Sequence, residues 1–567
     1  MSDHHTYRLC NCLAWLIIIV CLFNPAFRKT LAANNNPIPT KRYWLFYTEP
    51  ERSPDELEEA KQAVAEQLSP RSLKRRQKMI ASNPPVRLCD LPPPPEFVNS
   101  IEQTGCRIVH VARYLKAVSI EGTAEQFVSA TALPFVKSSR PVMGFASSRM
   151  EDTPVHEFKG SSDLIADSAD YGFSYRHSAV VNIQAAHNLG YRGRGILIGV
   201  QDTGFSNLRH RCFTTLDIVA AYDFVNGDNN VANHGDLGDG AHGSKVLSVI
   251  AGIDSGFYIG VAPEAEFVLT KTENTIGERP IEEDAWVAGL WFHDSTGTEV
   301  LSSSLSYDDW YNYEDMDGQT AVTSIAADSA VAAGIVILNS AGNNGRDGYP
   351  NDKVGAPADA QRVITVGGVL TDSSKWTGAS IGPTFDGRIK PDVSAQSVGV
   401  YVASTRDLTT YQPSNGTSFS TPTVSGIVAL ILEANHDLTP YQVINILHQT
   451  SHMAQHPDTL RGYGIPNAVA AIRLAESMSV RREINPPVEF VISAYPNPFN
   501  RRLYIDFGRE GVARTIKLID MHGRVVRNFQ NYQAESSIDF SGLSAGSYIV
   551  RAEGIHSIDA VRIVYLP

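Results

Sequence analysis

The sequence predicts a central α/β region with a parallel sheet and helices on both faces, preceded by a small α+β domain and followed by a small all-β sandwich. Three observations predict this order. Apolar β-type runs alternate with helical stretches through the middle of the 567-residue chain. Residues 41–140 mix strands and helices, and the segment after residue 485 consists of short alternating runs. A chain of this length is too long for one hydrophobic core, so several domains are expected.

Residues 1–33 have the pattern of an export signal. Arg8 supplies positive charge, Cys12–Phe23 is a 12-residue apolar core, and Thr30–Ala33 offers small residues for cleavage. The apolar core is shorter than the ~20 residues that a membrane-spanning helix needs. We therefore expect residues 1–33 to be a signal peptide and the protein to be exported.

Three of the six cysteines lie in this predicted signal. Cys89, Cys106 and Cys212 remain, and an odd number cannot form a complete disulfide framework. A bond between Cys89 and Cys106 is one alternative, but we expect all three cysteines to be free.

Residues 41–140 predict the small α+β domain. Ser53 followed by Pro54 and early acidic residues is a typical helix start. The run Pro92–Pro95 predicts a rigid break. The other predicted elements are strands at Tyr43–Tyr47 and in Arg107–Ile120 and a helix at Thr123–Leu133.

Residues 175–475 predict the parallel sheet, because β-type runs and helices alternate along them. The runs are Ile196–Val200, Phe267–Thr270, Glu299–Ser302, Ile335–Leu338 and Val363–Val366, and the helical stretches lie near 242–252, 281–292, 318–333 and 418–434. Sheets of this kind place their functional sites at the carboxyl ends of the strands.

Ser418 lies where a small loop, Ser414–Thr417, enters an apolar helix. Free N–H groups and the positive end of the helix dipole stabilise negative charge at such a position, which suits a nucleophile. A helix-capping serine is the plain alternative and is common. What favours the nucleophile is the set of polar residues elsewhere in the chain.

A serine nucleophile needs a base, an orienting group for the base and donors for the oxyanion. Asp202 ends the buried run Ile196–Val200, His242 opens an apolar helix, and Asn343 follows the run Ile335–Leu338. Each residue alone has an ordinary structural explanation. Together, each beside glycine at the end of an element, they predict a catalytic set.

These four segments resemble the subtilisin-like serine proteases, and the resemblance covers roughly residues 175–475. It implies that Ser418 is the nucleophile, His242 the general base and acid, Asp202 the orienting carboxylate and Asn343 an oxyanion donor. Three segments depart from the family pattern at five positions: Ser244 replaces a threonine, Phe419 and Ser420 replace Met-Ala, and Gln396 and Ser397 replace Pro-Gly. None of them removes a catalytic group.

The resemblance also implies two segments that bind substrate. Ser304, Leu305 and Ser306 resemble the edge strand that pairs with substrate backbone, and Ser340, Ala341 and Gly342 would line the other side of the main specificity pocket. Asp308 and Asp309 are expected to be solvated loop acids. The acid clusters Asp236/Asp239 and Glu314/Asp315/Asp317 lack the regular spacing of a calcium loop. We therefore assign no metal and no cofactor, and a structural calcium ion is not assignable to any residues.

The segments Arg107–Ile120, Thr123–Leu133 and Leu133–Lys137 resemble the inhibitory propeptide of the same family. Residues 41–140 carry 15 Lys+Arg against 12 Asp+Glu, whereas residues 171–475 carry 17 against 32. Opposite charges favour docking, so we expect this region to fold onto the catalytic domain as chaperone and inhibitor, with the maturation cut between about 144 and 174. A small α+β binding domain is the alternative.

Residues 485–567 predict the all-β sandwich. Its opening, Tyr495–Asn500, with Asp520–Arg524 and Gly542–Tyr548, resembles the C-terminal sorting domain of type IX secretion. The resemblance implies a Gram-negative bacterium, transit through the periplasm, and release or anchoring at the cell surface. An accessory module that binds carbohydrate or protein is the alternative.

The sequence therefore predicts a secreted serine endopeptidase that forms an acyl-enzyme with an Asp-His-Ser triad. Protein and peptide substrates, its own propeptide and the secretion machinery are the expected partners, and the acidic catalytic region argues against nucleic acid. The sequence leaves two alternatives. Asp202-Thr-Gly204 and Asp254-Ser-Gly256 superficially match aspartic proteases, although those enzymes need two similar halves. The other alternative is a catalytically inactive surface adhesin or binding scaffold.

Overall fold

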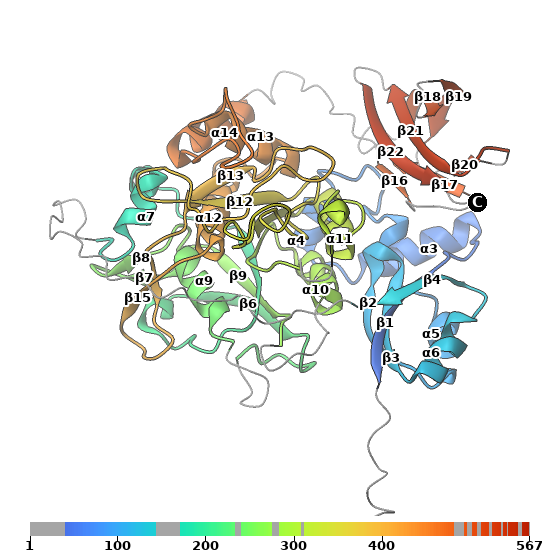
Figure 1. The fold of residues 1–567 in the computed structure, drawn as a ribbon, viewed down its shortest axis with the longest axis horizontal. Helices are drawn as coiled ribbons and strands as arrows, with labels where there is room; N and C mark the ends of the chain where they lie inside the picture. Colours follow the sequence, from blue (N-terminus) through green and yellow to red (C-terminus); the bar gives the residue numbers. More distant parts are fainter. Residues whose placement is uncertain are drawn as a thin grey trace, which may run out of the picture.

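The computed structural model describes three bodies of the chain (Figure 1). The described residues are 40–142, 170–232, 240–274, 283–307 and 311–480, and in the C-terminal region 493–495, 502–506, 512–520, 524–533, 537–540, 542–553 and 558–565. The predicted signal peptide, most of the predicted maturation segment, and the acids Asp236, Asp239, Asp308 and Asp309 lie outside them.

Seven parallel strands form the central sheet, in the order β13-β12-β11-β10-β5-β9-β6. Their bounds are β5 Leu197–Asp202, β6 Asp217–Asp223, β9 Glu266–Lys271, β10 Val300–Ser303, β11 Val336–Ser340, β12 Ile364–Val369 and β13 Val393–Gln396. The five predicted runs are five of these strands, and the two that the sequence did not predict are the edges. The predicted α/β class is confirmed.

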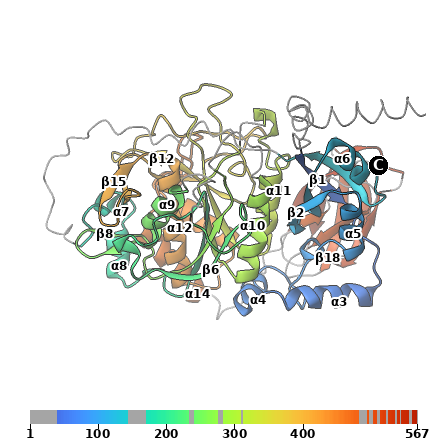
Figure 2. The same ribbon diagram turned by 90° about the horizontal axis from the view of Figure 1, so that it is seen from below.

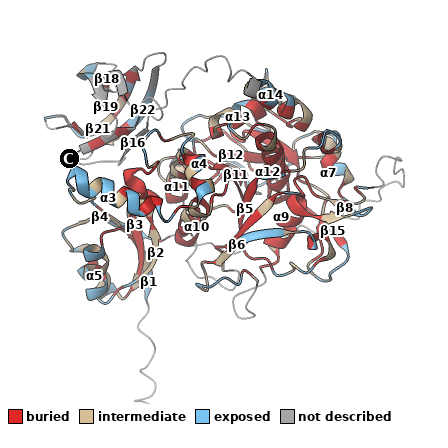
Figure 3. Cartoon of the chain, turned by 180° about the vertical axis from the view of Figure 1, so that it is seen from behind, coloured by how far each residue is buried: buried red, intermediate tan, exposed pale blue. Residues whose placement is uncertain are grey.

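Helices cover both faces of this sheet, as predicted. On one face α9 (His242–Ala251) and α12 (Thr417–Ala434) share a buried cluster with Ile198 and Val200 of β5. On the other face α10 (Glu283–Thr296) and α11 (Val322–Ala332) share a cluster with Leu301 and Ile337. Figure 3 shows α12 as part of the buried centre, where every residue from Thr417 to Leu432 is buried.

Smaller elements complete the central domain. They are α7 Tyr175–Val180, α8 Ile183–Asn188, α13 Pro440–Thr450, α14 Ala468–Val480, the pair β7 Ile253–Asp254 and β8 Tyr258–Ile259, and the hairpin β14 Val400–Ala403 and β15 Tyr411–Ser414. The hairpin matters for the site, because β15 leads directly into the loop before α12.

The N-terminal domain is an antiparallel sheet in the order β2-β3-β1-β4 with helices beside it. Its elements are β1 Lys41–Tyr47, α3 Pro54–Ala65, α4 Pro70–Arg76, α5 Pro95–Gln103, β2 Arg107–Ala112, β3 Ala117–Gly122, α6 Ala124–Thr131 and β4 Val136–Pro141. Ser53 forms a capping box with Glu56 at the start of α3, as the Ser-Pro signal predicted. The prediction of a rigid break through Pro95 was wrong at its end, because Pro95 is the first residue of α5.

This domain packs against α10 and α11 of the central domain (Figure 2). Trp44 is fully buried there and donates its indole N–H to Glu283 at 2.8 Å. Arg42 pairs with Asp284 at 3.3 Å. Val142, the last described residue of the domain, belongs to the same buried cluster as Leu305. The basic N-terminal domain is therefore docked on the acidic one.

The C-terminal domain is an all-β sandwich, as predicted (Figure 1). One sheet holds β16 Ser493–Tyr495, β17 Arg502–Asp506 and β20 Ser537–Asp539, and the other holds β18 Val512–Asp520, β19 Val525–Gln533, β21 Gly546–Glu553 and β22 Ile558–Tyr565. The two sheets share one buried cluster, which includes Leu503, Leu518 and Ile563 and no residue of the other two domains. This domain therefore has its own core.

Cys89, Cys106 and Cys212 are buried and free, as predicted. Within the described residues, no helix combines the length and the apolar character needed to cross a membrane.

Candidate active site

Asp202 is the last residue of β5 and is fully buried. Its neighbours in the strand are held between two helical layers, so the carboxylate is fixed at the carboxyl edge of the sheet. Asp202 Oδ1 accepts hydrogen bonds from Thr203 N and from His242 Nδ1, both at 2.8 Å. This places the carboxylate where it orients an imidazole.

His242 is the first residue of α9. A carboxylate only accepts, so the contact with Asp202 makes Nδ1 the protonated ring nitrogen and leaves Nε2 as the free base. The next residue must be glycine, since a Cβ at Gly243 would lie 2.4 Å from Gly204 O. The His242 ring therefore approaches the end of β5 only because residue 243 carries no side chain.

Ser418 is the second residue of α12, in the first turn, as predicted. It is 8% exposed, whereas Thr417 and Phe419 on either side are 0% and 1% exposed. The Phe419 ring lies 5.8 Å from the His242 ring, between centroids. The start of α12 is thus beside His242, and Ser418 is the least buried residue of its first turn.

Asn343 lies just past β11, and its side chain is held in one orientation by Thr417. Asn343 Oδ1 accepts hydrogen bonds from Thr417 N and Thr417 Oγ1, both at 3.0 Å. The amide Nδ2 is therefore turned away from Thr417. A Cβ added at Gly416 would lie 3.6 Å from Asn343 Nδ2 and 3.7 Å from Ser418 N, so the two donors border one small space.

The two segments predicted to bind substrate leave the adjacent strands β10 and β11. Asn339 Nδ2 ties them together, donating to Leu305 O at 2.9 Å and to Ser340 O at 3.0 Å. Ser304 Oγ donates to Ser418 O at 3.0 Å, which links one segment to the start of α12. Ala341 N bonds to Val366 O of β12 at 3.0 Å.

Gly342 of one segment lies close to Ser306 of the other. A Cβ at Gly342 would lie 2.8 Å from Ser380 Oγ and 3.9 Å from Ser306 Oγ. Gly342 has φ +103°, which a residue with a side chain rarely adopts. The structure thus brings all six predicted residues to one region, and Ser380 joins them from a distant loop.

Sequence reasoning missed Thr417, Asn339 and Ser380. Thr417 stands beside Ser418 in the sequence, but only the three-dimensional contact shows that it orients Asn343. Asn339 and Ser380 carry no motif of their own. Of the departures from the family pattern, Ser244 Oγ accepts from Asn207 N at 3.1 Å, and Gln396 is buried with its amide donated to Val398 O.

Other polar groups that the sequence drew attention to are engaged elsewhere. Asp254 pairs with Arg211 at 2.6 Å and accepts from Tyr411 OH at 2.7 Å, so it does not share a proton with Asp202. It lies in the two-residue strand β7. Asp315 and Asp317 accept bonds from backbone N–H groups of their own turns. The described residues contain no group of three metal-ligating side chains.

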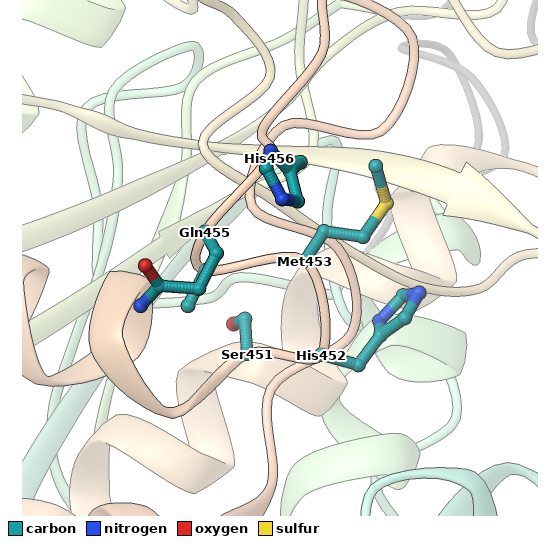
Figure 4. Close-up of a pocket in the computed structure, with 6 residues that line it drawn as sticks. Ser451, His452, Met453, Gln455 and His456 are labelled. Atoms are coloured by element: carbon teal, nitrogen blue, oxygen red, sulfur yellow. The ribbon is translucent and has the colours of Figure 1, made fainter.

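A hollow of about 390 Å³ opens after α13, lined by residues from Ser451 to His456 (Figure 4). None of the predicted catalytic residues lines it. His452 Nδ1 accepts a hydrogen bond from Ile465 N at 2.7 Å, so one imidazole nitrogen is used to hold the loop. This hollow is separate from the site at Ser418.

Comparisons with known proteins agree with this geometry. Residues 193–465 match the model of the Subtilase family, residues 42–156 match the Peptidase S8 propeptide domain of Bacteroidota, and residues 493–564 match the Secretion system C-terminal sorting domain.

Three curated relatives illustrate the similarity. Subtilisin DY of Bacillus licheniformis is 33% identical over 264 residues, which cover 46% of this chain and 85% of that protein. Subtilisin E of Bacillus subtilis is 29% identical over 303 residues, 53% of this chain and 69% of the relative. Serine protease AprX of Bacillus subtilis is 30% identical over 307 residues, which cover 49% of this chain and 66% of that protein.

The three matches follow one another in the order that the sequence predicted. A propeptide match, a catalytic match and a sorting-domain match on one chain are those of an exported zymogen of a Gram-negative bacterium. The chain belongs to the subtilase family, and it is a secreted or cell-surface serine endopeptidase.

Proposed function

We propose that Ser418, His242 and Asp202 form the catalytic triad of this endopeptidase and that Asn343 completes its oxyanion hole. The observation that carries the proposal is the hydrogen bond from His242 Nδ1 to Asp202 Oδ1, made beside Ser418, the least buried residue in the first turn of α12.

The arrangement supplies each step of acyl transfer. His242 Nε2 takes the proton of Ser418 Oγ as the oxygen attacks the peptide carbonyl, and Asp202 stabilises the imidazolium that results. Ser418 N–H and Asn343 Nδ2 donate to the oxyanion. His242 then gives its proton to the leaving amine, and a water molecule, activated in the same way, releases the acyl group from Ser418. The mechanism uses no metal ion and no cofactor.

The substrate lies between the two segments tied by Asn339. Its backbone pairs with Ser304, Leu305 and Ser306, and the side chain before the scissile bond enters between that segment and Ser340, Ala341 and Gly342. The link from Ser304 Oγ to Ser418 O supports this placement, since it fixes the distance between the pairing segment and the nucleophile.

The N-terminal domain acts as an intramolecular inhibitor. Its Trp44 and Val142 belong to the same buried cluster as Leu305 of the substrate-binding segment, which supports an inhibitor that docks on the catalytic domain. The C-terminal domain acts as the sorting signal that the secretion machinery recognises, and its separate core supports an independent role.

Casein hydrolysis by the processed protein tests the triad. Ser418→Ala, His242→Ala and the double variant should each lose almost all activity, and the double should be no worse than the singles, because the two groups act as one unit. Equal activity in Ser418→Ala and wild type would reject the proposal and favour a different nucleophile. Wild-type protein that has shed its propeptide yet hydrolyses nothing would favour the binding-scaffold reading.

A further inference from the structure

Three charged side chains form a row across the carboxyl edge of the central sheet. In the strand register Asp202 of β5 is opposite Lys271 of β9, and Lys271 is opposite Asp223 of β6. All three are 0% exposed. Adjacent strands are about 4.8 Å apart, so the three side chains are immediate neighbours.

The row lies on the sheet face that carries α9. Side chains alternate along a strand, and Gln201, next to Asp202, faces α10, where its amide donates to Trp286 O. Thr270, next to Lys271, likewise faces α10, where it bonds to His293. Asp202 and Lys271 therefore face α9, whose first residue is His242.

The stem of Lys271 runs beneath the loop that leads to His242. A Cβ at Gly204 would lie 3.3 Å from Lys271 Cδ and 3.2 Å from Gly240 Cα, two residues before His242. The ammonium ends 3.3 Å from Asp223 Oδ2. Asp223 is fixed in turn, because Val225 N and Asn226 N donate to its other oxygen at 2.8 and 2.9 Å.

Asp202 has an oxygen that the triad does not use. Oδ1 receives both of its hydrogen bonds, whereas the buried Oδ2 accepts none from a described residue. A buried negative charge is stabilised by a nearby cation. Lys271, one strand away on the same face, is placed to supply that cation.

We propose that Lys271 is a positioning residue for the triad: its buried ammonium, paired with Asp223, offsets the negative charge of Asp202 beneath His242. This inference rests on the proposed roles of Asp202 and His242. The charged and titratable groups around the row are Asp202 on β5, Asp223 on β6, Lys271 on β9, His242 and Lys245 on α9, and Glu273 just beyond β9.

The consequence is a defined shift in the pH dependence of hydrolysis. The neutral imidazole is the active base, so kcat/KM falls on the acidic side as His242 takes up a proton. Removing the cation in Lys271→Met leaves two buried carboxylates to favour the imidazolium. The acidic limb of kcat/KM should then move up by about one pH unit. Asp223→Asn removes a negative charge and should move the same limb down.

The experiment measures kcat/KM for a peptide substrate from about pH 5 to about pH 9, the range in which histidine titrates. The variants are Lys271→Met, Lys271→Arg, Asp223→Asn and, as a matched control, Lys390→Met. Lys390 also forms a buried ion pair, with Asp392 at 2.7 Å, but next to β13 at the opposite edge of the sheet. Lys271→Arg should restore the wild-type limb, and Lys390→Met should lower the melting temperature without moving the limb.

The outcomes separate this inference from the proposed function. Activity that persists in Ser418→Ala rejects the triad itself, whether or not the pH profiles of the other variants shift. With that variant inactive, shifts of opposite sign in Lys271→Met and Asp223→Asn support the role of Lys271. A limb that stays in place in Asp223→Asn overturns it, and this variant decides the matter if Lys271→Met does not fold. Lower activity at every pH with an unmoved limb would mean that Lys271 is only structural.

Discussion

At the scale of single residues, the oxyanion donor Asn343 depends on a neighbour that carries no catalytic group. Thr417 gives both its N–H and its hydroxyl to Asn343 Oδ1, so the amide can turn only Nδ2 toward the space beside Ser418 N. The residue before the nucleophile thus fixes which end of the asparagine side chain meets the substrate.

Asn343→Ala should lower kcat by about 10²–10³ and leave KM almost unchanged, because the lost hydrogen bond strengthens only in the transition state. Thr417→Val keeps the shape and one of the two bonds, so a smaller fall is expected. Steady-state kinetics with a chromogenic peptide provides the measurement. An unchanged kcat in Asn343→Ala would remove Asn343 from the oxyanion hole.

Asp359 is a second residue with a testable property, this time in stability. Burial raises its pKa to about 6, against the opposing effect of hydrogen bonds from Ser324 and Gly318 N. The folded state therefore binds this proton more tightly than the unfolded chain does. Its contribution to stability is largest when protonated and is lost as pH rises through about 6.

Asp359→Asn keeps a neutral group that can bond to both partners. It should stabilise the protein by about 2 kcal/mol at pH 8 and change little at pH 4, since a raised acid pKa costs stability only when the group is ionised. Thermal melts at the two pH values measure the difference. A variant less stable than wild type at pH 8 would contradict this account of the carboxylate.

The residues of the site were predictable to different degrees. Asp202, His242, Asn343 and Ser418 were identified because each ends or begins an apolar element beside glycine, and that pattern survives in the linear sequence. Thr417 and Lys271 were not identified, because their roles depend on contacts between distant elements. Lys271 in particular ends an ordinary apolar strand, and only the register beside Asp202 gives it significance.

At the scale of elements, the prediction failed where an element has little apolar sequence of its own. β6 is an edge strand whose first residues are exposed, and β13 is an edge strand of only four residues. The five interior strands are buried on both faces and read as apolar runs. Helix α4 was not predicted for the same reason, since it has few apolar residues. Its polar side chains are buried against charged groups of the central domain.

Helix α4 anchors the N-terminal domain through a buried charge network. Arg75 and Arg76 both donate to Asp294 in the last turn of α10, and Arg76 also pairs with Asp90 at 2.8 Å. Burial alone would raise the pKa of Asp294, but Arg76 and Arg75 hold it below its usual value. The anchor is remote in sequence from the chain that leaves the domain at Val142, so the propeptide holds the catalytic domain at two places.

Asp294→Asn should weaken this hold strongly, because it leaves two buried guanidinium groups with too little negative charge. The loss of one partner from a buried pair costs about 3–5 kcal/mol, or more than 10² in affinity. The measurement is the lag before activity appears in the full-length chain, and this lag should be shorter in Asp294→Asn than in wild type. Arg71→Ala is the matched control. It breaks a partly exposed pair with Glu266 and should change the lag little. An unchanged lag in Asp294→Asn would show that α4 does not hold the propeptide on the catalytic domain.

At the scale of the whole molecule, the chain consists of three domains, and two of them share part of their buried core. The central domain and the N-terminal domain share a buried cluster across α10 and α11, whereas the cluster of the C-terminal sandwich contains only its own residues. This division was predictable because composition and periodicity change at the linkers. How the N-terminal domain docks was predictable only as a charge preference, since contacts such as Trp44 to Glu283 and Arg76 to Asp294 join residues more than 200 positions apart.

Deletion of residues 485–567 should separate activity from export. The central domain loses no core residue, so the truncated protease should mature and hydrolyse casein, yet stay in the periplasm instead of reaching the medium. Fractionated cells assayed for activity and for the protein provide the measurement. Normal secretion of the truncated chain would refute a sorting role, and an inactive but stable truncated chain would mean that the sandwich supports catalysis.

The most direct test of the central claim is to locate the nucleophile. The processed protein is treated with a fluorophosphonate, which reacts with an activated serine, and the modified peptide is identified by mass spectrometry beside Ser418→Ala and His242→Ala. The account predicts one adduct, on Ser418, in wild type and none in either variant. An adduct on another residue, or none in protein that has shed its propeptide, would contradict the triad proposed here.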